Sequence, residues 1–165
     1  MNNIALDKKL MFKALKEAKR GIPYVYPNPA VGCVIYDGSK ILSTGYHKKF
    51  GENHAEHEAI KNLDEMVKGL TMYVSLEPCT HTGKTGACLD LIDPEVFDRV
   101  VIAEKDPNSE ASGSIEKLKK RGIKVDLGLL KHEARKLNKR FYVFHELKRP
   151  YVILKYASTL DGFIA

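Results

Sequence analysis

The chain has 165 residues, of which 44% are hydrophobic and 29% charged, and this is the composition of one soluble globular domain. No apolar run approaches the eighteen or so residues that span a bilayer, and the N-terminus lacks a secretion signal, so we expect a cytoplasmic protein with no membrane partner. The net charge of +6 suits an anionic partner, but we favour solvated lysine-rich helix faces over nucleic-acid binding because no basic stripe carries interleaved aromatic residues.

The first half of the chain predicts a helix, a hairpin, a second helix and a buried strand. Residues 7–20 carry apolar side chains at helical spacing between lysines. The apolar runs 30–36 and 41–46 flank an Asp-Gly pair, which is typical of a β-hairpin. A helix is predicted over 54–67, and a strand over 71–76 leads into a polar loop.

Strands and helices alternate through the second half. A short helix near 86–93 precedes a strand at 99–103, and a helix at 114–121 precedes a strand at 123–127. Residues 131–147 are expected to form one last amphipathic helix. This alternation predicts an α/β layered domain with a partly parallel sheet, complete by about residue 147. A further strand is predicted over residues 149–156, beyond the end of this domain.

One histidine and two cysteines carry metal-binding chemistry. His54-Ala55-Glu56 stands at a predicted helix start, and Cys79 is followed, after eight intervening residues, by Cys88. Imidazole and thiolate are ligands that suit Zn²⁺, and three of them leave the fourth tetrahedral position for water. Glu56 is placed to move protons beside that water without being a ligand itself. The remaining cysteine, Cys33, lies in an apolar run and is expected to be a buried, inert thiol.

Each motif has an ordinary alternative. A His-Ala-Glu triplet at a helix start can be a surface histidine beside an acid, and a cysteine pair can belong to a structural zinc site. A structural site would need a fourth ligand, which is not evident, and it has no use for Glu56. A His-x-Glu motif combined with Pro-Cys-x-x-Cys is the signature of zinc deaminases, although here eight residues, rather than two, separate the cysteines.

The sequence resembles the deaminase half of the bifunctional deaminase–reductases of riboflavin biosynthesis. Their cysteine spacing, with His-x-Gly-Lys-Thr in the gap, separates them from transfer-RNA adenosine, cytidine and guanine deaminases. The chain departs from the family after Asn108, where one glycine replaces a Pro and a glycine pair, and at Gly86-Ala87, where the family has Pro-Pro. The matching segments are 27–33, 45–51, 54–56, 77–85, Cys88 and 106–108.

The resemblance implies a cytidine-deaminase-like three-layer α/β/α sandwich with a mixed sheet. It implies the substrate 2,5-diamino-6-ribosylamino-4(3H)-pyrimidinone 5′-phosphate, which loses ammonia to become 5-amino-6-ribosylaminouracil 5′-phosphate. In this hypothesis zinc held by His54, Cys79 and Cys88 activates water, and Glu56 shuttles its protons. The family's substrate contacts carry over to Asn28, His47, His81, Lys84 and, more weakly, Asn108. Without the resemblance, we would interpret each of these as an ordinary loop residue.

The resemblance also divides the chain. Residues 1–147 correspond to the deaminase domain, and residues 148–165 to the first strand of a reductase domain that is otherwise absent, so no reductase activity is expected. A deaminase for another nucleobase, nucleoside or nucleotide is the first alternative, and a non-catalytic zinc-stabilised assembly module is the second. The predicted partner is a small phosphorylated pyrimidine, and the sequence is also compatible with a homo-oligomer.

Overall fold

A five-stranded mixed sheet forms the centre of the computed structural model, which describes residues 3–81 and 86–164. The strand order is β2-β1-β3-β4-β5. β1 is antiparallel to both β2 and β3, whereas β4 runs parallel to its neighbours β3 and β5. The predicted mixed sheet is therefore confirmed. Its strands are β1 (Gly32–Tyr36), β2 (Ile41–Tyr46), β3 (Leu70–Val74), β4 (Phe97–Ile102) and β5 (Lys124–Leu127).

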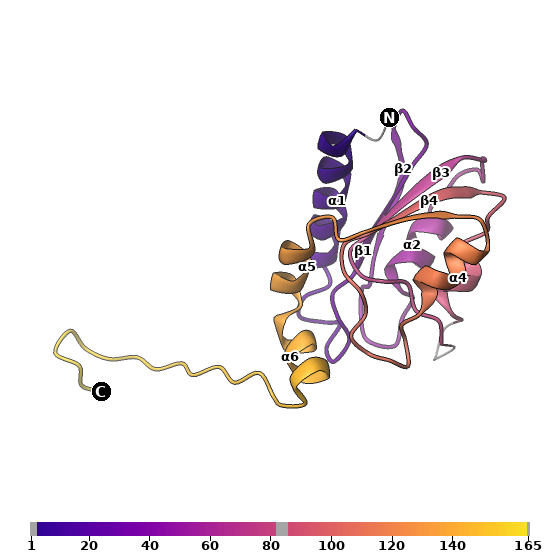
Figure 1. The fold of residues 1–165 in the computed structure, drawn as a ribbon. Helices are drawn as coiled ribbons and strands as arrows, with labels where there is room; N and C mark the ends of the chain where they lie inside the picture. The colour runs from indigo at the N-terminus through magenta and orange to yellow at the C-terminus, as the bar shows by residue number, and fades with distance from the viewer. Residues whose placement is uncertain (1–2, 82–85, 165) are drawn as a thin grey trace.

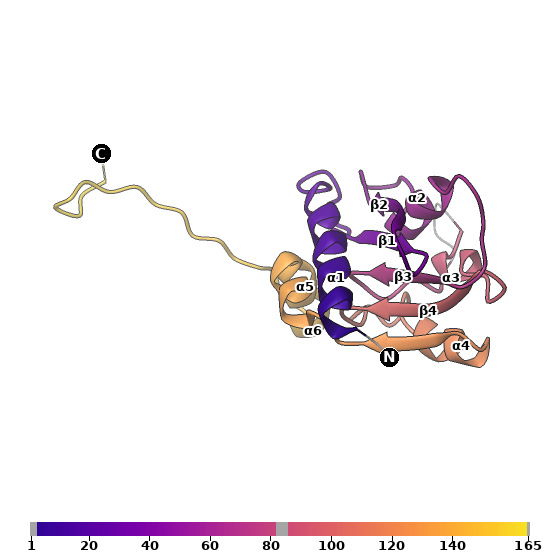
Figure 2. The ribbon, with the colours of Figure 1, turned by 90° about the horizontal axis from the view of Figure 1, so that it is seen from above.

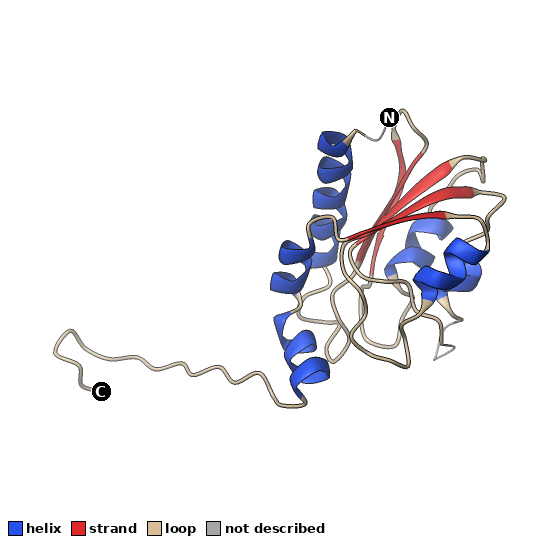
Figure 3. Cartoon of the chain, viewed as in Figure 1, coloured by secondary structure: helices blue, strands red, loops and turns tan. Residues whose placement is uncertain are grey.

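Helices cover both faces of the sheet and make the predicted three layers (Figures 1 and 3). The view from above shows α1 and α5 on one face, and α2, α3 and α4 on the other (Figure 2). None of the helices in the described residues is long and apolar enough to cross a membrane. The helices are α1 (Ile4–Lys19), α2 (Ala55–Lys61), α3 (Cys88–Leu91), α4 (Ser114–Lys120), α5 (Lys131–Leu137) and α6 (Lys139–Leu147).

Alternate residues of the central strands build two cores. Ile35 and Met72 face the layer of α2 and α4, while Val34 and Tyr73 face α1 and α5. This is the period of two that a strand imposes on its side chains. Cys33 is fully buried in the first core, as expected.

Two glycines let helices lie directly on the strands. A Cβ atom on Gly32 would stand 2.0 Å from the carbonyl oxygen of Ala14 in α1, and one on Gly45 would stand 2.2 Å from that of Ala55 in α2. Any side chain at either position would push a helix off the sheet. The contact at Gly45 matters for the site, because it fixes where α2 begins.

Two of the predicted helices differ from the helices in the structure. The helix predicted over 54–67 ends at Lys61, where Asn62 leaves helical geometry and its side-chain amide donates to the carbonyl of Thr44. The helix predicted over 131–147 is two helices, broken at Asn138. The buried side chain of Asn138 bonds to the backbone of Ala30, which holds the break in place.

The strand predicted over 149–156 is wrong for the described residues. This segment has no regular secondary structure, and Val152 and Leu154 are 75% and 85% exposed. Figure 1 shows it leading away from the layered domain. A strand needs a neighbour to bond its backbone groups, and no described strand runs beside this segment.

Candidate metal centre and active site

His54, Cys79 and Cys88 come from three separate segments of the chain and lie close together in the fold. His54 has extended backbone geometry directly before α2, Cys79 lies in the loop after β3, and Cys88 opens α3. Their ligand atoms all lie within 4.8 Å of one another. Nδ1 of His54 is 3.5 Å from Sγ of Cys79 and 3.3 Å from Sγ of Cys88, so Nδ1 is the nitrogen that faces both sulfur atoms.

The chemistry of this donor set fits zinc. A hydrogen bond from the neighbouring Cys88 thiol, aided by His54, lowers the pKa of Cys79. The backbone N–H of Cys88 also donates to Sγ of Cys79, at 3.3 Å. Both contacts favour a thiolate, which is the form that binds a metal ion. His54, Cys79 and Cys88 are one nitrogen and two sulfur donors, and a tetrahedral ion held by them keeps an open position.

Glu56 lies beside the three ligands in the first turn of α2. Its side chain is only 3% exposed, and burial raises its pKa to about 7. Cys88 is close enough for a hydrogen bond with the Glu56 carboxylate. A carboxyl group that titrates near neutral pH can both accept and donate a proton under physiological conditions. A cation among the ligands would favour the carboxylate and lower this pKa.

Comparison with known proteins identifies the centre. Residues 4–104 match the family model of the cytidine and deoxycytidylate deaminase zinc-binding region. The chain is 45% identical over 137 residues to the diaminohydroxyphosphoribosylamino-pyrimidine deaminase of Buchnera aphidicola subsp. Schizaphis graminum, covering 82% of this chain and 93% of that one. It is 47% identical to the riboflavin biosynthesis protein RibD of Aquifex aeolicus. The chain belongs to the RibD-type zinc deaminases.

The match to RibD proteins covers nearly all of this chain and less than half of theirs. The alignment with the Aquifex aeolicus protein spans 97% of this chain and 45% of the relative. A solved structure, the diaminohydroxyphosphoribosylaminopyrimidine deaminase/5-amino-6-(5-phosphoribosylamino)uracil reductase of Thermotoga maritima, superposes with a TM-score of 0.92 at 41% identity. That superposition covers 98% of this chain and 47% of the other. The cytidine-deaminase-like fold implied by the sequence is confirmed.

A cavity of about 170 Å³ opens onto the metal centre of this RibD-type deaminase. Its lining includes Glu56, His54 and Cys79 together with four of the five residues predicted to contact the substrate: Asn28, His47, His81 and Asn108. The fifth, Lys84, lies outside the described residues. Segments that are far apart in the sequence thus converge on one pocket.

His47 and Asn28 form an ordered pair in the wall of the pocket. Nδ1 of His47 lies 3.0 Å from the carbonyl oxygen of Asn53, which can only accept, so Nδ1 carries the hydrogen. Burial lowers the pKa of His47, so the ring is neutral and its Nε2 accepts from the amide nitrogen of Asn28, at 3.1 Å. The other amide atom of Asn28, Oδ1, is then directed away from His47.

Sequence analysis did not assign several of the residues that line the pocket, among them Glu77, Asp106 and Phe141. Burial raises the pKa of Asp106 to about 6. The proximity of the two acidic residues to Cys79 and Asn108 in the sequence was the available signal. Phe141 supplies an apolar wall from α6. Only the folded chain brings that residue near the metal ligands, and no local pattern marks it.

Proposed function

We propose that the chain hydrolyses 2,5-diamino-6-ribosylamino-4(3H)-pyrimidinone 5′-phosphate to 5-amino-6-ribosylaminouracil 5′-phosphate and ammonia. The observation that carries the proposal is one pocket, which Glu56 and the ligands His54 and Cys79 share with predicted substrate-binding residues, among them Asn28, His47 and Asn108. The name of the Buchnera aphidicola relative, nearly all of which this chain covers, supports the same substrate. The eight-residue cysteine gap supports it over other nucleobases.

Glu56 acts as the proton shuttle in this proposal. Zinc, when bound, lowers the pKa of water so that a hydroxide nucleophile is available near neutral pH. The Glu56 carboxylate accepts a proton from the attacking water and gives it to the ring nitrogen next to the amine-bearing carbon. A second proton from that water passes through Glu56 to the amine, the C–N bond breaks, and ammonia leaves as the carbonyl forms.

The remaining pocket residues hold the substrate. Because His47 engages the amide nitrogen of Asn28, Oδ1 of Asn28 is the atom offered to a donor on the ring or sugar. His81 is exposed at the pocket rim and Asn108 lies in its wall. We assign these residues to polar contacts with the ribosyl part, and Lys84 to the phosphate as a point charge.

We also propose that residues 148–165 correspond in sequence to the first strand of a reductase domain, although residues 148–164 have no strand geometry here. The sequence resemblance supports this, as do the greater length of the RibD relatives and the exposed apolar side chains of Val152 and Leu154. Such side chains would be buried by a neighbouring sheet. A cytoplasmic location and a homo-oligomeric state stay predictions.

Ammonia release from the diaminopyrimidine ribosyl phosphate tests the proposed function. The protein should contain about one zinc per chain, and the same preparation should be assayed with cytidine, dCMP and guanine. We expect release from the diaminopyrimidine alone. Release only from one of the other amines would show that the centre deaminates a different substrate. No release from any of them by zinc-loaded protein would contradict the proposal.

A further inference from the structure

Glu77 is a buried carboxylate that neither binds the metal nor moves a proton in the reaction. It lies just beyond β3, two residues before Cys79, and is 4% exposed. Its Oε1 accepts hydrogen bonds from the backbone N–H of Gly113 at 2.8 Å, from Ile115 at 3.4 Å and from the hydroxyl of Ser114 at 3.3 Å. Its Oε2 accepts from the backbone N–H of Asp106 at 3.3 Å.

One side chain therefore holds both ends of the segment 106–115. The residue before α4 is Gly113, which has no side chain to cap the helix, and the Glu77 carboxylate accepts from its first N–H groups instead. Negative charge is also favourable at that helix end. Between the two anchored ends lie Asn108 and Ala111, which form part of the pocket wall.

The same segment is tied to the metal loop a second time. The backbone N–H of Thr80 donates to the carbonyl of Ala111 at 2.9 Å, and the Thr80 hydroxyl donates to that of Ser112 at 3.0 Å. Thr80 follows Cys79 directly. The loop that carries a zinc ligand and the wall that carries Asn108 thus share one frame of hydrogen bonds, to which Glu77 contributes a buried carboxyl group.

We propose that Glu77 is a positioning residue that fixes the pocket wall bearing Asn108 relative to Cys79, and thereby sets the affinity for substrate. The inference rests on the proposed function for its kinetic effect, but not for its effect on the segment 106–115. Glu77→Gln keeps the size of the side chain and replaces one acceptor oxygen with an NH₂ group. That group would face a backbone N–H, so one end of the segment loses its anchor.

Glu104 supplies the matched control. It is a carboxylate at the end of the neighbouring strand β4 and is 5% exposed, almost as buried as Glu77. Its oxygens bind Lys131 and Arg135 of α5 and the backbone N–H of Lys105. Among the described residues, these partners all lie outside the segment 106–115. Glu104→Gln therefore removes an equally buried charge without releasing the pocket wall.

The experiment compares full-length, zinc-loaded wild type, E77Q and E104Q. Amide hydrogen exchange is followed over residues 106–115, and kcat and KM are measured with the diaminopyrimidine ribosyl phosphate. For E77Q we expect faster exchange in this segment, KM raised about tenfold with kcat changed less than about threefold, and unchanged zinc content. E104Q should leave exchange in the segment and KM as in wild type. Ser114→Ala, which removes one donor to Glu77, should shift both quantities less in the same direction.

Two results would overturn the inference. One is E77Q exchange over 106–115 that matches wild type. The other is a loss of zinc and of kcat at constant KM, which would give Glu77 a role in holding the ligands. If E77Q does not fold, S114A decides by the same two measurements. If wild type shows no turnover, the proposed function fails, while the exchange data still test the positioning of the segment.

Discussion

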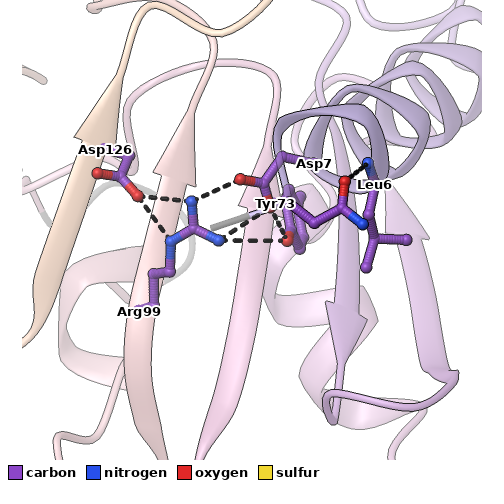
Figure 4. A network of polar contacts seen from close by, with 6 residues as sticks. Leu6, Asp7, Tyr73, Arg99 and Asp126 are labelled. Atoms are coloured by element: carbon purple, nitrogen blue, oxygen red, sulfur yellow. Dashed lines mark hydrogen bonds and ion pairs between the residues drawn. The ribbon is translucent and has the colours of Figure 1, made fainter. Parts of the chain in front are cut away.

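The domain contains two clusters of buried and partly buried ionisable groups that differ in how completely their charges are paired. In the first, Arg99 of β4 binds both oxygens of Asp7 in α1, at 2.8 and 2.9 Å, and Nε of the same guanidinium binds Asp126 at 2.6 Å (Figure 4). The hydroxyl of Tyr73 also donates to Asp7, at 2.6 Å. Every charge in this cluster meets an opposite charge.

The second cluster, formed by Glu56 and the zinc ligands, contains no such cation with a permanent charge. Its carboxyl group has a raised pKa because burial opposes ionisation, whereas hydrogen bonds from Arg99 lower the pKa of Asp7. Ionisable groups with perturbed pKa values that gather at a pocket are typical of a functional centre. A cluster in which every charge has an opposite charge as its partner contributes to the stability of the fold instead. The difference predicts that variants of the two clusters affect different measurements.

Glu56→Gln should have the largest effect, and on activity alone. Glutamine fills the same space but cannot accept the proton of the attacking water, so kcat should decrease by about 10²–10⁴-fold. Zinc content should stay at the wild-type level, because Glu56 is not among the ligand atoms that cluster. Ammonia release and metal analysis of the same sample provide the measurement. A rate near that of wild type would rule out the proton-shuttle role.

Arg99→Met should have its effect on stability instead. The variant removes the guanidinium that pairs with Asp7 and Asp126, and Asp7 is buried, so the free energy of unfolding should decrease by about 3 kcal/mol. The kcat at a temperature where the variant is folded should change little. Urea denaturation gives the first quantity. Arg20→Met is a matched control, because the Arg20 side chain is exposed and its ion pair with Glu17 should contribute much less to stability.

The sequence contained enough to predict the layers, the mixed sheet and the zinc ligands. Short apolar runs mark the strands locally, and His54, Cys79 and Cys88 stand in motifs whose chemistry is recognisable without the fold. The contacts that join distant segments could not be predicted from the sequence. Nothing near Arg99 indicates that it meets Asp7, and the break at Asn138 is invisible because the sequence around it keeps a helical pattern. In both cases a long-range hydrogen bond decides the outcome.

Asn138→Ala should affect both stability and substrate affinity, because the Asn138 side chain holds the backbone of Ala30, close to the pocket residue Asn28. The Asn138 side chain accepts from the N–H of Ala30 at 2.8 Å and donates to its carbonyl at 2.9 Å. Without it, two buried backbone groups lose their partner, which should cost about 1–3 kcal/mol of stability. Ala30 is two residues from Asn28, so KM should increase several-fold. A variant with altered stability and unchanged KM would show that Asn138 acts on the stability of the fold alone.

The smallest effect concerns pH and tests the pairing of Asp7 directly. Because the pKa of Asp7 is lower in the folded state, through the hydrogen bonds from Arg99, its pairing stabilises the fold fully above the unfolded pKa of about 4. That contribution is lost as the pH decreases through the folded value, by about 1.4 kcal/mol for each unit that separates the two pKa values. The stability difference between wild type and Asp7→Asn, measured by urea denaturation, should therefore narrow from pH 6 to pH 2. A difference that stays constant over this range would mean that Asp7 contributes through packing and not through its charge, and the contrast between the two clusters would then rest on Arg99 and Asp126 alone.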